Sequence, residues 1–243
     1  YMVYSHGLSI AKGDLIIMTT ITDGFIDRNW FAKCVNVLDS NKELSGVFGM
    51  SANMDYAGNL KKIDQDDFVL KAAPTKEKIL PFYLATNYPL PELNICIYKN
   101  VYKNIFGPYI SEKLPEYEAF QYSYYKLITH GYLIDFIPTI ANFGRDHKDS
   151  ITDKTIRAKK WPYKNFEKYR RRFVLNLLFN KFSFIDKNNN IIRSINIKTK
   201  IKFLSLIFYY KLTRKTYSEN FQILDIYNHI YRLITKARKL IQK

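Results

Sequence analysis

The chain has 243 residues, 47% of them hydrophobic, and a formal net charge of +16. This apolar content excludes a disordered chain, and the length predicts one folded domain with an appendage. The longest apolar stretch, residues 203–210, is too short to cross a bilayer core of roughly 30 Å. Cys34 and Cys96 lie in apolar runs without metal-ligand spacing, so we expect them to be small buried side chains in a reducing cytoplasm.

The charge is divided unevenly along the chain. Residues 154–243 contain 23 Lys and Arg against 4 Asp and Glu, whereas residues 1–153 contain 15 against 18. Such a basic half predicts an anionic partner, which could be nucleic acid, acidic lipid headgroups or a phosphorylated acceptor. The opening residues lack the basic flank of a signal peptide. Because the chain opens on Tyr1 rather than Met, we expect a piece of a longer protein.

The first half predicts alternating strands and helices. A helix is expected from about Asp27, a plausible N-cap, because apolar residues recur at helical spacing from Trp30 to Leu38. Prolines at three positions between residues 60 and 90 favour irregular structure there. Strands are expected at residues 15–18, 46–50, 93–98 and 132–137, a turn at 55–59, and a helix from Pro115 to His130 that stops at Gly131.

The second half predicts a basic helical tail. From Asn165 onward, apolar side chains form stripes at helical spacing and Lys and Arg fill the remaining faces. Further stretches of this kind cover residues 197–213 and 221–241. Two roles remain open for the stripes: they could lie on an anionic membrane face, or they could pack on the rest of the protein.

Residues 7–23 resemble the segment of family 2 glycosyltransferases that leads to their metal-binding signature. The stretch GLSIAKGDLII at residues 7–17 has the helix end, the Ala-x-Gly-Asp/Glu turn and the buried strand of that segment, and the helix with Trp30 follows on schedule. In the family, an Asp-x-Asp type motif after the strand holds a divalent cation against the donor diphosphate. The matching positions here are Thr20, Thr22 and Asp23, so the resemblance implies Asp23 as the metal ligand.

This departure bears on the cofactor. Mg²⁺ or Mn²⁺ prefers carboxylate oxygens, and Thr20 and Thr22 offer neutral oxygens instead, so we expect weakened or lost metal dependence. Asp23 also has a simpler interpretation as a turn residue before Gly24. Both interpretations stay open from the sequence.

Residues 143–150, FGRDHKDS, resemble the family's Tyr-Arg-x-His-x-x-Ser block, a loop after the last core strand that closes over the diphosphate. The resemblance implies that Arg145, His147 and Ser150 bind the donor, and that His147 can also reach the cation. A third block, residues 114–118, resembles the acidic helix start that supplies the catalytic base. Glu116 and Glu118 are both candidates, and the dipole of a helix start would explain acidic residues there equally well.

The resemblance covers about residues 5–155 and implies a partial GT-A (Rossmann-like, mixed sheet) α/β core at residues 1–155, with a basic amphipathic helical tail at residues 156–243. The implied function is inverting transfer of a sugar from a nucleotide-sugar donor to a saccharide or lipid-linked acceptor in cell-surface polysaccharide synthesis. We expect a cytoplasmic protein that can lie on the inner membrane face. The nucleoside-binding unit of the family, near 100 residues, has no counterpart in this sequence.

Two other functions compete with sugar transfer. The basic tail, with Tyr and Phe among its Lys and Arg, could follow the phosphates of a single-stranded nucleic acid. Continuous apolar stripes fit packing or headgroup contact better, so nucleic acid is the less favoured partner. A non-catalytic glycosyltransferase relative is the other alternative, because Thr20 and Thr22 replace the expected carboxylates.

Overall fold

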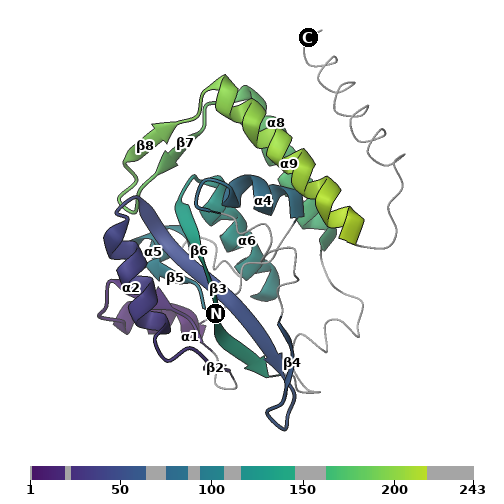
Figure 1. Ribbon diagram of the computed structural model, residues 1–243. Helices are drawn as coiled ribbons and strands as arrows, with labels where there is room; N and C mark the ends of the chain where they lie inside the picture. Colours follow the sequence, from purple (N-terminus) through teal and green to yellow (C-terminus); the bar gives the residue numbers. More distant parts are fainter. Residues whose placement is uncertain are drawn as a thin grey trace.

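The computed structural model describes residues 2–19, 23–63, 75–86, 94–106, 116–145 and 163–217. Helices surround a curled mixed sheet (Figure 1). The elements in chain order are α1 (Met2–Ile10), β1 (Leu15–Ile17), β2 (Gly24–Phe25), α2 (Trp30–Ser40), β3 (Leu44–Met54), β4 (Leu60–Ile63), α4 (Ile79–Thr86), β5 (Cys96–Tyr98), α5 (Lys99–Phe106), α6 (Glu116–Thr129), β6 (Leu133–Arg145), α8 (Tyr163–Phe179), β7 (Ser183–Ile185), β8 (Ile191–Ser194) and α9 (Ile197–Tyr217). The mixed α/β class expected from the sequence is confirmed.

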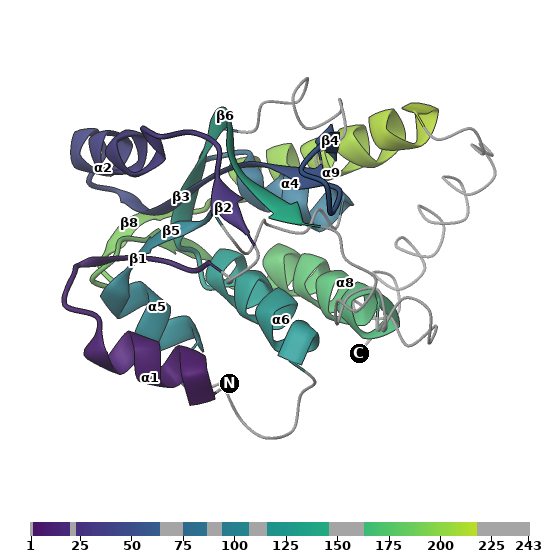
Figure 2. The same ribbon diagram turned by 90° about the horizontal axis from the view of Figure 1, so that it is seen from below.

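The main sheet has the strand order β1-β5-β3-β6-β2, and β4 pairs with β3 beside this path. The two long strands β3 and β6 run parallel at its centre, whereas β1, β5, β2 and β4 all pair antiparallel with their neighbours. Among the described strands, β1 pairs with β5 alone. Figure 2 shows α2 on one side of the sheet and α1, α5 and α6 on the other.

The core on the α2 side comes from the apolar repeat seen in the sequence. Trp30, Cys34 and Leu38 are buried, and α2 packs on β3. Gly49 of β3 makes room for this, since a Cβ there would stand 2.8 Å from the ring of Trp30. Cys34 and Cys96 are free and buried in this core, which confirms their interpretation as small core side chains.

Several elements begin or end away from the expected residues. Helix α2 begins at Trp30 instead of near Asp27, because Asp27 and Asn29 form a turn before it, in which the Asp27 carboxylate accepts a hydrogen bond from Asn29 N–H. Lys33 Nζ, from inside α2, donates to the same carboxylate. Strand β6 continues through Arg145. Its pairing with β3 is irregular between Phe136 and Ile140, and a proline such as the one at position 138 is tolerated at a bulge of this kind.

The expectation of irregular structure at residues 60–90 is wrong for β4 and α4. Helix α4 contains Pro81 at its third position, where the missing backbone N–H has no helical partner to lose. The tail also differs from the expected run of helices, because the hairpin of β7 and β8 separates α8 from α9. Its turn is fixed by Asp186, whose Oδ1 accepts hydrogen bonds from the backbone N–H groups of Asn188 and Asn190.

Part of the tail packs on the rest of the protein. Phe203, Ile207 and Tyr210 of α9 are buried and belong to the same hydrophobic cluster as the sheet. Helix α9 lies along α4, where the rings of Phe82 and Tyr210 meet edge to face at 5.2 Å. This stripe of α9 therefore takes the packing role that the sequence left open. In the described part of the chain, no helix is long and apolar enough to cross a membrane.

Candidate functional site

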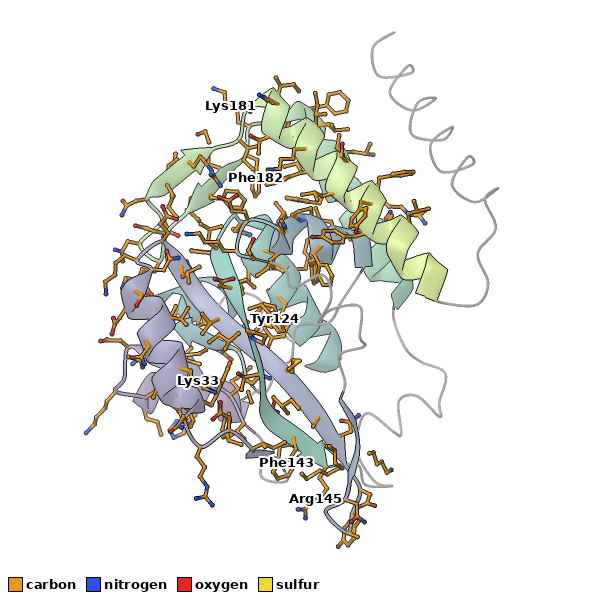
Figure 3. All side chains as sticks on the ribbon, in the orientation of Figure 1. Lys33, Tyr124, Phe143, Arg145, Lys181 and Phe182 are labelled. Atoms are coloured by element: carbon orange, nitrogen blue, oxygen red, sulfur yellow. The ribbon has the colours of Figure 1, made fainter. Side chains whose placement is uncertain are left out.

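The short strand β2 brings two of the sequence motifs together. It pairs antiparallel with the end of β6, with Gly24 opposite Phe143 and Phe25 opposite Asn142. Ile26 N–H continues the contact by donating to Ala141 O at 2.9 Å. As a result Asp23, which directly precedes β2, lies beside the last residues of β6. Figure 3 shows Phe143 and Arg145 at this end of the strand.

Asp23 and Arg145 meet directly. The backbone N–H of Arg145 donates a hydrogen bond to Asp23 Oδ1 at 3.0 Å, across 122 positions of sequence. Between them Gly144 presents a bare backbone: a Cβ there would stand 3.8 Å from Asp23 Oδ1 and 3.7 Å from Asn53 Oδ1. Asn53 pairs with Gly144 across β3 and β6. Two side-chain oxygens therefore flank a glycine at the edge of the site.

The packing of Phe143 fixes the shape of this end of the sheet. A Cβ on Gly24 would stand 2.8 Å from Phe143 Cε1, so the ring of Phe143 occupies the space that a side chain at residue 24 would take. The guanidinium carbon of Arg145 lies 5.9 Å from the centre of the Phe143 ring, within the range of a cation–π contact. Arg145 is exposed and offers a positive charge to an anionic ligand at the strand end.

Behind the site lies a buried cluster of polar side chains. Asn142 Oδ1 accepts hydrogen bonds from Ser51 Oγ at 2.7 Å and from Asn94 Nδ2 at 2.8 Å. Asn94 also accepts from Gly49 N–H at 3.1 Å and donates to Met50 O at 3.0 Å. The amide of Asn142 makes no hydrogen bond through Nδ2 with any described residue. This cluster ties β3 and β6 to the turn before β5, next to β2.

The turn after β2 is held by charge. Lys33 Nζ lies 2.7 Å from Asp27 Oδ2, and Asn29 N–H donates to Asp27 Oδ1 at 2.9 Å. The hydrogen bond from Lys33, followed by that from Asn29, holds the pKa of Asp27 below its ordinary value. Asp27 therefore stays ionised at neutral pH and connects β2 to the start of α2, but it is occupied by Lys33 and adds no further carboxylate to Asp23.

The other predicted site residues fall outside the described side chains. Thr20 and Thr22 precede Asp23 in a segment that the structure does not describe, and His147 and Ser150 follow Arg145 in another. Glu116 and Glu118 lie in the first turn of α6, as expected, and their side chains are outside the description. Of the predicted residues, the described structure thus brings together Asp23 and Arg145.

Arg145 occupies a different kind of segment from the one expected. The resemblance placed residues 143–150 in a loop after the last core strand, but residues 143–145 form the end of β6. The pairing with β3 extends to Met54 opposite Arg145, so the backbone of Arg145 is fixed by the sheet. A strand end gives Asp23 a rigid hydrogen-bond donor, which a closing loop would not.

Asn53 and the Ser51–Asn94–Asn142 cluster were not found by sequence reasoning. The available signal was the presence of polar residues inside apolar strands, as at Asn142 between Ala141 and Phe143. Within the described residues, no three His, Cys, Asp or Glu side chains gather where they could hold a metal ion. Asp23 is therefore a single carboxylate at the end of β6 rather than part of a described metal cage.

Comparison with known proteins adds no assignment. Neither the protein-family models nor the curated proteins contain a match to this sequence. The functional interpretation accordingly depends on the motif blocks and on the geometry around Asp23 and Arg145.

Proposed function

We propose that this chain carries the diphosphate side and the acceptor side of a family 2 glycosyltransferase of the GT-A type. The observation that supports it most is the hydrogen bond from Arg145 N–H to Asp23 Oδ1. These two residues belong to separate motif blocks that the resemblance assigns to one site. The sheet brings Arg145 N and Asp23 Oδ1 within 3.0 Å of each other. Two residues that bind one diphosphate have to lie this close together.

The sheet order is consistent with a partial GT-A core. Since β1 pairs with β5 alone among the described strands, its other edge can accept the parallel strands of a nucleotide-binding unit. Dinucleotide and nucleotide sites in open α/β sheets lie at the carboxyl ends of strands, and Asp23 follows β1 in the chain on that side.

The proposed reaction is an inverting displacement at the anomeric carbon of a nucleotide sugar. The acceptor hydroxyl oxygen forms a bond to that carbon as the bond from the carbon to the diphosphate oxygen breaks. Glu116 or Glu118 takes the proton of the hydroxyl. Arg145, with His147 and Ser150, neutralises and binds the diphosphate that leaves. The acceptor is a saccharide or a lipid-linked saccharide of a cell-surface polysaccharide.

A divalent cation such as Mg²⁺ or Mn²⁺ would help by neutralising charge on the leaving diphosphate. The described donor set fits it poorly, because Asp23 offers one carboxylate and one of its oxygens already accepts from Arg145 N–H. We therefore assign no step to a metal. We expect the complete enzyme to keep most of its transfer activity when a chelator is added, and a full loss that Mg²⁺ or Mn²⁺ restores would contradict this expectation.

The test of the site is diphosphate binding. The 243-residue chain is titrated calorimetrically with inorganic pyrophosphate, with and without Mn²⁺, and compared with Arg145→Ala and Asp23→Ala. Arg145→Ala removes the charge that faces the ligand, so binding should weaken at least about tenfold, the loss of one charge-assisted contact. Asp23→Ala should weaken binding as well, because the end of β6 loses its anchor to the segment before β2.

Two controls make the titration specific. Arg193→Ala removes an exposed arginine of β8 that pairs with Glu77. Asp39→Ala removes an exposed carboxylate of α2 that pairs with Lys42. Both should bind as the parent does. If the parent does not bind pyrophosphate, or if the controls lose as much affinity as the site variants, the proposed diphosphate site is wrong.

A further inference from the structure

Helix α9 has an exposed face of mixed apolar and basic side chains, on the side away from the stripe that packs on α4. Ile197 and Ile201 are 65% and 57% exposed, and Phe208 and Tyr209 are 44% and 56% exposed. Lys198 and Lys202 are exposed between them. At 100° per residue, Ile197, Ile201 and Phe208 form one stripe and Lys198, Lys202 and Tyr209 form the next. We call these six residues the α9 outer face.

The end of α8 extends this face. Lys200 Nζ donates to Asn180 O at 2.7 Å, and Ile195 N–H donates to Phe182 O at 2.8 Å, so the last turn of α8 lies against the first turn of α9. Phe179, which is 57% exposed, and Lys181, which is also exposed, lie at this end of α8. Figure 3 shows Lys181 pointing outward at this corner of the molecule. The corner repeats the combination of apolar and basic side chains.

The charge around the face is of one sign. Residues 163–217 contain fourteen Lys and Arg against two acidic residues, and no Asp or Glu occurs between Asp186 and Glu219. A second copy of the chain that packed through its own α9 outer face would bring the same charge and be repelled. A nucleic acid would match the lysines but would leave Ile197, Ile201 and Phe208 in water. A lipid surface, with anionic headgroups outside and acyl chains beneath them, matches both the lysines and the apolar side chains.

We propose that the α9 outer face binds the surface of a membrane that contains anionic lipids. The lysines meet the phosphate headgroups, and the isoleucines and Phe208 enter the boundary between headgroups and acyl chains, as in helices that lie in the membrane interface. The opposite stripe of α9 stays in the core of the protein. In this arrangement α9 lies parallel to the membrane surface and contacts it through one face. The proposal does not depend on the proposed sugar transfer.

The experiment uses the full chain and sedimentation with vesicles of phosphatidylcholine alone or with 30 mol% phosphatidylglycerol. Two variants change the face: Lys198→Glu with Lys202→Glu, and Ile197→Ser with Ile201→Ser. All four side chains are exposed, so the fold should persist, and thermal melting checks this. The parent should bind the anionic vesicles and not the neutral ones. The lysine variant should lose at least about tenfold in the partition coefficient, and the isoleucine variant several-fold.

A matched control separates the face from the overall charge. Lys12→Glu with Lys103→Glu makes the same change in net charge at exposed positions near α1 and α5, and it should keep most of the binding. A single-stranded oligonucleotide is titrated in parallel. If the isoleucine variant binds vesicles as the parent does while the lysine variant loses vesicles and oligonucleotide alike, the face is a polyanion site and the proposal is overturned. Equal vesicle binding by the parent and both face variants also overturns it.

Discussion

At the scale of single residues, Gly131 shows how a backbone requirement fixes a junction. It ends α6 with a φ of +95°, a conformation that side chains disfavour, and its carbonyl oxygen accepts a hydrogen bond from Ile185 N–H at 3.0 Å. A Cβ on Gly131 would stand 2.2 Å from Ser183 O. The glycine that the sequence suggested as a helix stop thus also admits the β7 strand against α6.

Substitution of Gly131 tests this double role. Gly58 also has a positive φ of +90°, but a Cβ there meets no atom within 4 Å, so Gly58→Ala carries the strain without the clash. We expect Gly58→Ala to cost about 1 kcal/mol of unfolding free energy and Gly131→Ala to cost at least about 2 kcal/mol more, because Ser183 must move. Urea denaturation of both variants measures this. Equal costs would show that the contact with Ser183 is easily relaxed.

The partly buried carboxyl of Asp135 leads us to expect that the stability of the fold depends on pH. Burial raises the pKa of its carboxyl above the ordinary value of 3.8, against the opposing hydrogen bond from Phe136 N–H at 2.9 Å. A carboxyl with a higher pKa in the folded state loses part of the stability of the fold as the pH rises from its unfolded pKa through its folded pKa. Asp135→Asn keeps an oxygen for Phe136 and removes the charge.

Asp135→Asn should therefore have a higher Tm than the parent at pH 7, and the difference should shrink as the pH falls through the unfolded pKa and disappear below about 3, where the carboxyl is protonated in both states of the parent. Calorimetric melting at a series of pH values checks the trend. Asp39→Asn, at an exposed position paired with Lys42, is the control and should not reproduce it. A gain in Tm that is independent of pH would contradict the explanation from ionisation.

At the scale of elements, the sequence predicted those whose signals are local. The helix with Trp30 and the helix that stops at Gly131 were found because apolar spacing and a terminal glycine lie within a few turns of each other. The end of β6 was not found, because its partner in β3 is far away in sequence and Pro138 interrupts its pattern. Asp23 was found through the resemblance of residues 7–23 to a family segment, whereas Asn53 became visible only when β3 paired with β6.

The Ser51–Asn94–Asn142 cluster is a contact between elements that could be seen only in the structure. Asn94 binds Gly49, Met50 and Asn142, which lie 44 to 48 positions away along the chain. Without the Asn94 side chain, the buried Gly49 N–H and Asn142 Oδ1 each lose a partner. We expect Asn94→Ala to lower the unfolding free energy by about 2–4 kcal/mol.

Asn59→Ala is the matched control for Asn94→Ala. The Asn59 amide donates to Asp55 Oδ2 at 3.0 Å in an exposed turn, where water can replace the lost partner, so the cost should stay near 0.5 kcal/mol. Hydrogen exchange of the Gly49 amide supplies a local measurement beside the urea titration. Similar costs for the two variants would mean that water enters the space left by Asn94 and satisfies its partners.

At the scale of the whole molecule, the division into a core and a tail applies to charge more than to packing. The basic residues concentrate after position 154, as the sequence showed, but the apolar side chains of α8, β7 and α9 join the cluster that covers the sheet. Edge-to-face rings link Tyr125 of α6 through Phe173 and Phe182 to Phe184. The position of the charge could be predicted from composition. The shared core could not, because it depends on which stripe of α9 faces α4.

A pair of substitutions on α9 tests whether tail and sheet unfold together. Ile207 is 6% exposed and belongs to the shared hydrophobic cluster, while Ile201 is 57% exposed on the outer face. Ile207→Ser should lower the free energy of unfolding by about 3–5 kcal/mol, through lost burial, a cavity and a buried hydroxyl, whereas Ile201→Ser should change it by no more than about 0.5 kcal/mol.

If the molecule is one cooperative unit, Ile207→Ser lowers the protection of β3 amides in the sheet by the same free energy that it removes from α9. Hydrogen exchange measured residue by residue decides this, because loss of protection confined to α9 would show that the tail opens independently of the sheet.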